Sequence, residues 1–324
     1  MYKRQAITKD NVVQFLYKYD ERGNKIEETT LDSLGNKVHF SEDVATVKWE
    51  YDNRNNKVKT TYFNKSGELA NAKQNITFNI YKYNTEDILI ERLNYDRSFE
   101  PKGLNNVYRT VIIPNRKGED SIVKLYNPKN ELIIVEKYFY NKYGNKIRVE
   151  YYDRNNIRTK NSAGISSITY LFDNKQQSIG YRYSDEKNKL VNSVQDFAME
   201  LYTLNETGYI TQYTYFDKDI KPTIGPEGYH KQNIVFDDSG EIIVIETLDA
   251  KNKLIEDQYG IAKYVYTRNE ARMIQSEKYY NKNLELTDYK DEGAEIYYTP
   301  SRNGLFFIEK RINSKGEELT ATTD

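Results

Sequence analysis

The 324-residue sequence contains no cysteine and has only 6 prolines, 16 glycines and 2 histidines. The lack of cysteine excludes disulfides, thiolate catalysis and cysteine-based metal sites. The two histidines, His39 and His230, stand at unrelated places, which argues against a histidine-ligated zinc or a proton relay. No apolar run approaches the length of a membrane span, and the first ten residues lack the apolar core of a secretory signal. The sequence leaves the compartment and the oligomeric state undetermined.

The chain also lacks an excess of charge of either sign. Lys and Arg number 48 against 49 Asp and Glu, a formal net charge of −1, so nucleic acid is not expected as the main partner. Hydrophobic residues make up 38% of the chain, which argues against one large compact core. Aromatic residues make up 14%, with 31 tyrosines, which argues against disorder. A repeat array can bury its apolar area thinly along its length, as this composition requires.

An internal repeat follows from the positions of Asp and Asn. One column of these residues recurs at spacings of 32, 32, 31, 26, 32, 32, 32, 32 and 32, at Asp32, Asn64, Asp96, Asn127, Asp153, Asp185, Asp217, Asp249, Asn281 and Asn313. A second column lies twelve residues upstream, at Asp20, Asp52, Asn84, Asn115, Asn141, Asp173, Asn205 and Asp237. Asp and Asn favour turns because their side chains accept a hydrogen bond from the backbone two residues on. Each repeat is predicted to hold two turns, and one repeat, before Asp153, is shortened.

Between the turns, apolar and aromatic residues alternate with a period of two, as in Val47, Trp49 and Tyr51. This alternation predicts half-buried strands. In segments 20–24 and 141–145, Gly or Asn stands where a short hairpin loop needs positive φ. Each repeat is therefore predicted to be a β-hairpin followed by a longer loop with room for a third short strand. The loops are predicted to end on apolar residues, at Val12, Val44, Ile76, Val107, Ile165, Phe197 and Tyr229.

The predicted fold class is all-β, with tandem hairpins of about 32 residues stacked into an elongated or spiral antiparallel sheet. A single continuous array is expected over residues 1–324, with approximate unit starts at 30, 62, 94, 125, 151, 183, 215, 247, 279 and 311. The last two units are predicted to be shifted capping units, because Tyr266-Thr267 and Tyr298-Thr299 stand where an aromatic residue and Asp or Asn are expected. A propeller is the alternative, disfavoured because 32 residues hardly supply a four-stranded blade.

The turn string Tyr19-Asp20-Glu21-Arg22-Gly23-Asn24, echoed by the segment 31–36, resembles the Tyr-Asp (YD) repeats of the bacterial Rhs and wall-associated protein families. The resemblance covers most of the chain loosely, in period rather than in identity. It implies a β-sheet spiral or shell at a bacterial surface or around a secreted toxin. It also implies carbohydrate binding, which is ascribed to some members of these families.

Two adjacent columns are predicted to face opposite sides of the sheet. The residue just before the first Asp/Asn column is apolar or aromatic in nine of ten repeats and predicts a core column, at Leu31, Phe63, Tyr95, Tyr126, Tyr152, Ser184, Phe216, Leu248, Tyr280 and Ile312. The residue before that supplies a candidate binding ladder, with Tyr62, Tyr151, Tyr183, Tyr215 and Tyr279. Exposed tyrosine rings could hold sugar rings or an extended polypeptide. The alternative is that these rings are packed, since β-propensity alone enriches tyrosine.

The remaining residues suggest neither a metal nor a catalytic site. Asp217 with Asp219, or Asp237 with Asp238, could approach calcium, but no segment matches a calcium-binding loop, so turn formation is favoured and no cofactor is expected. No nucleophile, phosphate-loop or dinucleotide motif is present, and no catalytic residue is assigned.

The expected function is a non-enzymatic repeat protein with an extended binding or scaffolding surface for protein or glycan, in a bacterial surface or secreted assembly. One alternative is a structural shell component related to toxin-encapsulating YD repeats. Another is a glycan hydrolase with two carboxylates, which would need a cleft with two facing acids and a raised pKa.

Overall fold

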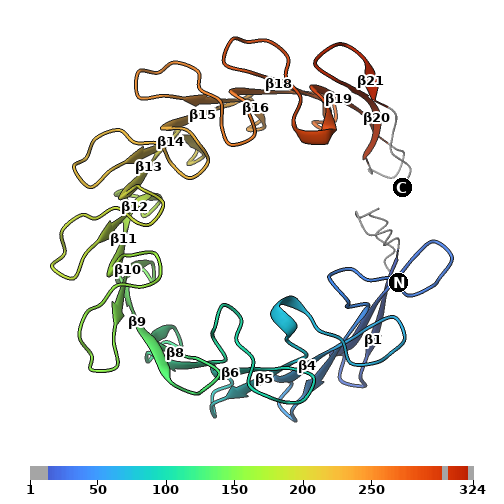
Figure 1. The fold of residues 1–324 in the computed structure, drawn as a ribbon, viewed down its shortest axis with the longest axis vertical. Helices are drawn as coiled ribbons and strands as arrows, with labels where there is room; N and C mark the ends of the chain where they lie inside the picture. Colours follow the sequence, from blue (N-terminus) through green and yellow to red (C-terminus); the bar gives the residue numbers. More distant parts are fainter. Residues whose placement is uncertain (1–13, 301–305, 320–324) are drawn as a thin grey trace. The chain divides into compact units, whose positions relative to one another are not determined.

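The computed structural model describes residues 14–300 and 306–319 and confirms the all-β fold of tandem antiparallel hairpins (Figure 1). The strands of the first half are β1 (Gln14–Tyr19), β2 (Lys25–Leu31), β3 (Thr46–Tyr51), β4 (Lys57–Phe63), β5 (Phe78–Tyr83), β6 (Leu89–Tyr95), β7 (Arg109–Pro114), β8 (Asp120–Tyr126), β9 (Leu132–Tyr140) and β10 (Lys146–Tyr152). Those of the second half are β11 (Ser167–Phe172), β12 (Ser178–Ser184), β13 (Met199–Leu204), β14 (Ile210–Phe216), β15 (Lys231–Phe236), β16 (Ile242–Leu248), β17 (Lys263–Arg268), β18 (Ile274–Tyr280), β19 (Glu295–Pro300), β20 (Phe306–Ile312) and β21 (Glu318–Leu319). Two single-turn 3-10 helices, η1 (Lys73–Asn75) and η2 (Lys290–Glu292), lie in the loops.

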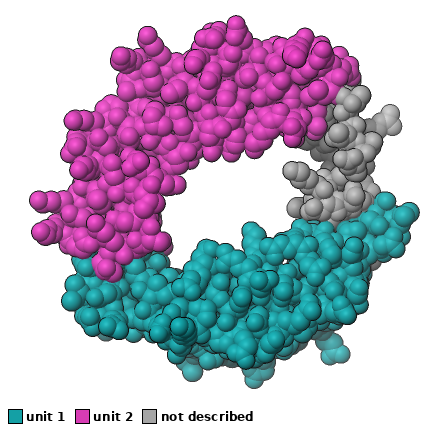
Figure 2. All heavy atoms as spheres, in the orientation of Figure 1, with its two compact units in different colours: residues 1–139, 150–158 teal, residues 140–149, 159–324 magenta. Residues whose placement is uncertain are grey.

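The chain divides into two compact units, coloured separately in Figure 2. Unit 1 comprises residues 1–139 and 150–158, and unit 2 comprises residues 140–149 and 159–324. The division falls in the hairpin of β9 and β10. The single array over residues 1–324 stays a prediction.

Both predicted turns are present in the repeats that the structure describes in full, and Asp or Asn organises them. In the first hairpin, the Asp20 Oδ1 atom accepts the backbone N–H groups of Arg22 at 3.0 Å and Asn24 at 2.8 Å. The fourth turn residue, Gly23, has a φ of 84°. The turn that follows the hairpin repeats this arrangement at Asp32, whose Oδ1 atom accepts the N–H groups of Leu34 and Asn36. The side-chain cap satisfies backbone donors that the bulged end of the hairpin leaves unpaired.

A single residue links the end of one hairpin to the next through its backbone, and in four repeats this residue is alanine. The Ala198 N–H group donates to the Phe216 carbonyl at the end of its own hairpin, and its carbonyl accepts from Tyr183 of the preceding hairpin, both at 2.8 Å. Ala45, Ala262 and Ala294 hold the equivalent position, and all four alanines are fully buried. The strands of successive hairpins pair over only three residues, as between β12 and β13. The long loop leaves the sheet beyond that short pairing.

The long loop folds back over one face of its sheet, which we call the loop face. In unit 2, this face carries Glu200 and Tyr202 of β13 and Tyr213 and Tyr215 of β14. The predicted apolar loop ends pack onto the face and are buried at Val44, Ile76, Ile165, Phe197 and Tyr229. The third strand that the loop could hold is reduced to a single bridge, such as Phe216 to Pro222.

The structure places the candidate ladder, rather than the predicted core column, on the more buried face. Tyr151, Tyr215 and Tyr279 of the ladder are buried beneath the loops. The core column points to the opposite, open face, where most members, such as Phe63 and Phe216, are half-buried. Alternation along a strand separates two faces, but it does not say which face a later loop covers.

The open face carries ion pairs between residues of neighbouring strands. Glu27 pairs with Lys18 at 2.7 Å and with Lys48 at 3.5 Å, and Lys48 also lies 5.0 Å from the ring centroid of Phe63. Lys263 and Glu246 repeat the pattern in unit 2 at 2.7 Å. Opposite charges across strands support the register, although each exposed pair stabilises the fold little.

Two irregularities of the repeat now have structural explanations. The shortened repeat lacks the long loop, because the turn at Asn127 leads directly into β9, which pairs with β8 from Ile122↔Lys137 to Tyr126↔Leu132.

The predicted shift at Tyr266-Thr267 is wrong. β17 continues to Arg268, and Asn269 caps the turn through the Ala271 N–H at 3.0 Å, in register with Asp237. The turn after Tyr298-Thr299 lies outside the described residues.

Candidate functional site

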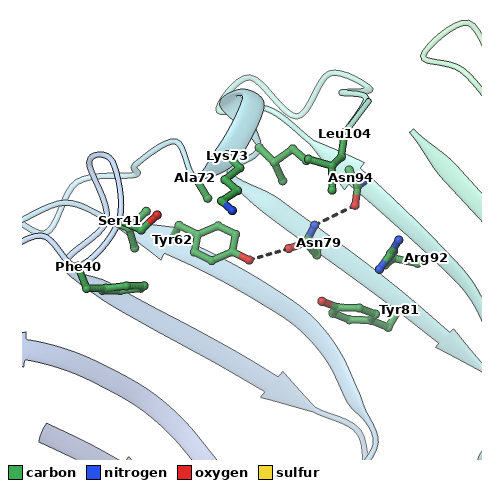
Figure 3. Close-up of a pocket in the computed structure, with 12 residues that line it drawn as sticks. Phe40, Ser41, Tyr62, Ala72, Lys73, Asn79, Tyr81, Arg92, Asn94 and Leu104 are labelled. Carbon is green, nitrogen blue, oxygen red and sulfur yellow. Dashed lines mark hydrogen bonds between the residues drawn. The ribbon is translucent and has the colours of Figure 1, made fainter. Parts of the chain in front are cut away.

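A groove of about 400 Å³ lies on the loop face of unit 1 (Figure 3). Strands β4, β5 and β6 supply its floor, and the three loops that follow β2, β4 and β6 supply its walls. The floor residues are Tyr62, Asn79, Tyr81, Arg92 and Asn94, and the loop residues are Phe40, Ser41, Val44, Ala72, Lys73, Ile76 and Leu104. This volume lies within the range of small-molecule sites.

A chain of hydrogen bonds fixes the polar side chains of the floor. The Tyr62 hydroxyl donates to Asn79 Oδ1 at 2.9 Å, Asn79 Nδ2 donates to Asn94 Oδ1 at 2.9 Å, and Asn94 Nδ2 donates to the Val107 carbonyl at 3.0 Å. Burial, with a smaller effect of Tyr81, raises the pKa of Tyr62 to about 12. The phenol therefore remains protonated at neutral pH, and each amide keeps one further N–H for a ligand.

The groove lies where smaller side chains occupy positions that two neighbouring repeats of unit 2 fill with aromatic rings. The ladder position in β6 is Asn94, and the loop ends that line the groove are Val44 and Ile76. In unit 2 the same kinds of position hold Phe197, Tyr215 and Tyr229, which form one packed cluster. There the ring centroids of Phe197 and Tyr215 are 5.2 Å apart, so the space that is open in unit 1 is filled.

The five predicted ladder tyrosines have different surroundings. Tyr62 lines the groove and is half-buried. Tyr215 donates to Glu227 at 2.9 Å and Tyr279 donates to Glu277 at 2.6 Å, and both rings are buried, as is Tyr151. The half-buried Tyr183 packs against Phe197 at 5.3 Å between ring centroids. Ligand binding by the ladder stays a prediction, and Tyr62 is the member that the groove makes accessible.

The other candidate residues have local structural partners. Asp217 caps a turn through the N–H groups of Asp219 at 2.9 Å and Lys221 at 2.8 Å. The Nε2 atom of His39 lies 3.3 Å from the Oδ1 atom of Asp43. His230 is buried, with its Nδ1 atom 3.2 Å from the Thr223 carbonyl. Trp49 packs against the cluster of Val44, Val47 and Ala70.

One buried carboxyl group lies on the loop face of unit 2. Burial raises the pKa of Glu200, and the nearby Glu227 raises it further, although a hydrogen bond from Tyr181 opposes the shift. Glu200 is packed into the strand layer beneath the loops, next to Tyr215. The raised pKa thus follows from core packing and by itself assigns no reaction.

Exposed apolar side chains recur on three consecutive long loops of unit 2. Val194, Ile224 and Tyr259 have relative exposures of 70%, 44% and 41%. We call these three residues the loop row. Neighbouring loops contact each other through the backbone. The Val194 N–H group donates to the Ala163 backbone carbonyl at 3.0 Å, and the Gln258 N–H group donates to the Glu227 backbone carbonyl at 2.8 Å. Sequence reasoning missed both the loop row and the groove. The tyrosine column is interrupted at Asn94, but it is also interrupted at Thr30, Leu125 and Thr247, so this break by itself did not single out the groove.

No protein-family model matches this chain, and no curated protein matches it. Among solved structures, it is similar to a chain of the Photorhabdus luminescens Tc holotoxin pore, at 13% identity over 88% of this chain, with a TM-score of 0.42. It is also similar to chains of the TcdB2-TccC3-Cdc42 complex (11% identity, 89% of this chain, TM-score 0.37) and the TcdB2-TccC3 complex (12%, 93%, 0.35). The chain spans only 14%, 17% and 18% of those three chains. In the described part of the molecule, no helix has the length and apolar character needed to cross a membrane.

Proposed function

We propose that this protein is a non-enzymatic repeat scaffold that binds a protein partner through the loop row of unit 2. The observation that supports this function is the recurrence of exposed apolar side chains at Val194, Ile224 and Tyr259. Single exposed apolar residues are ordinary, whereas contiguous apolar patches mark interaction surfaces. We infer that the three side chains act together because they stand on consecutive loops. The open face serves this role less well, because its charges are paired with one another.

The test is capture of partners by the immobilised full chain from bacterial extracts and secreted fractions, with a glycan array run in parallel. The triple variant Val194→Ser, Ile224→Ser, Tyr259→Ser is expected to lose a captured protein at least tenfold, because apolar anchors dominate interface energies. The matched control is Val235→Ser, an exposed apolar residue of β15 on the open face. If the triple variant and Val235→Ser capture the partner equally well, the loop row is not the binding surface.

A structural shell component is the second candidate, in which the repeats contain or support another protein without a specific contact. The period of the hairpins and the YD-like turn string favour it. A chain that captures no partner and no glycan, and whose triple variant behaves like the parent chain, would support this role. Binding on the glycan array without capture of a protein would instead support the tyrosine ladder as a sugar-binding site.

A further inference from the structure

We propose that the groove in unit 1 is a binding site for a carboxylate attached to a six-membered ring. Arg92 and Lys73 would hold the carboxylate, and the ring would lie against the aromatic side chains of the groove. This site is independent of the loop row, which belongs to unit 2.

The charge of the groove selects an anion. Its twelve lining residues include two cations and no acid. Across the described residues neither Arg92 nor Lys73 forms an ion pair, whereas Arg109 of the adjacent strand is paired with Glu91 on the open face. A guanidinium group presents two parallel N–H donors whose spacing matches a carboxylate. An unpaired arginine above a floor of amide donors therefore favours a carboxylate ligand.

The walls and floor of the groove select a ring rather than an extended peptide. Strand β5 is hydrogen-bonded to β4 on one side and β6 on the other, so its backbone offers no free edge to a polypeptide. Recognition is left to side chains, among which Phe40, Tyr62 and Tyr81 contribute aromatic rings. Flat aromatic faces pack against sugar rings and aromatic rings alike. The remaining N–H of Asn79 can bind a ring substituent.

The shared chemistry has two sources, an acidic sugar and an aromatic acid. The probes are therefore glucuronate with neutral glucose as its counterpart, and benzoate with neutral benzamide as its counterpart. Trp49 provides the readout, since it is the only tryptophan of the chain and packs in the same cluster as Phe40 and Tyr62. Titration of the full chain should change Trp49 emission with at least one carboxylate. The neutral counterpart should bind at least tenfold more weakly, and added salt should weaken the carboxylate.

Two matched variants locate the site. Arg92→Gln should weaken carboxylate binding at least tenfold without changing the melting temperature, because this side chain is exposed. Arg116→Gln makes the same change of charge at an exposed position in the hairpin turn between β7 and β8, outside the groove, and should have no effect. Lys73→Gln provides a second charge removal in the groove and should weaken binding severalfold.

Each outcome decides the proposal. Selective binding of glucuronate supports it with an acidic sugar as the source, and selective binding of benzoate supports it with an aromatic acid as the source. Failure of both carboxylates to exceed their neutral counterparts overturns it, as does an equal loss in Arg92→Gln and Arg116→Gln. None of these results bears on partner capture by the loop row.

Discussion

At the residue scale, several turns hold an ordinary side chain where glycine would fit better. Ile220 has a φ of 61° in the turn that Asp217 caps, and its side chain is exposed. A β-branched residue in the left-handed region is strained, at a cost of about 1–2 kcal/mol. The turn keeps its form because Asp217 accepts the N–H groups of Asp219 and Lys221.

Ile220→Gly should therefore raise the free energy of unfolding by about 1 kcal/mol, since relief of strain exceeds the added entropy of the unfolded chain. Urea denaturation measures the change. Ile224→Gly is the control, because Ile224 is also exposed but has no positive φ, and it should lower stability by about 0.5–1 kcal/mol. A loss of stability in both variants would show that Ile220 is not strained.

At the element scale, the successive hairpins from β12 to β19 are bonded to one another by the same pattern. Tyr215 N–H donates to the His230 carbonyl at 2.9 Å, and Thr247 N–H donates to the Ala262 carbonyl at 2.9 Å, one repeat later. The pairing of β14 with β15 and of β16 with β17 covers three residue pairs in each case. One repeat can therefore be exchanged for the next without a change of register.

Deletion of residues 231–262 should leave a folded protein, because it joins His230 to Lys263 at equivalent places in the repeat. The stability of a repeat array is approximately a sum over its repeats, so the unfolding free energy should fall by roughly a tenth. Circular dichroism per residue and the melting curve measure the outcome. Deletion of 231–246 removes half a repeat and should abolish cooperative melting; survival of both deletions would argue against a fixed register.

At the scale of the whole molecule, the burial of tyrosine makes stability depend on alkaline pH. Burial raises the pKa of Tyr62 and Tyr266 to about 12 and raises those of Tyr215 and Tyr279 further. The folded chain thus holds protons that the unfolded chain releases above the ordinary tyrosine pKa of 10.0. This contribution to stability is complete below pH 10 and is lost as the pH rises through the folded-state values.

The protein should consequently unfold in a cooperative step at some point above pH 10. Tyrosinate absorbance and loss of the β-sheet circular dichroism signal should change together, because buried hydroxyls ionise only when the loops open. Gradual ionisation of all 31 tyrosines with unchanged circular dichroism would contradict the buried arrangement.

The sequence by itself determined the period, the hairpins and both turns of each repeat. These features depend on local physics, namely the alternation of side chains along a strand, the Asp or Asn cap at Asp20 or Asp32, and the positive φ at Gly23. Only the tertiary structure decided which face the loops cover and where they leave space. The burial of Tyr215 beneath Tyr229, and the opening of a groove beside Asn94 and Arg92, depend on packing between segments that no local pattern relates.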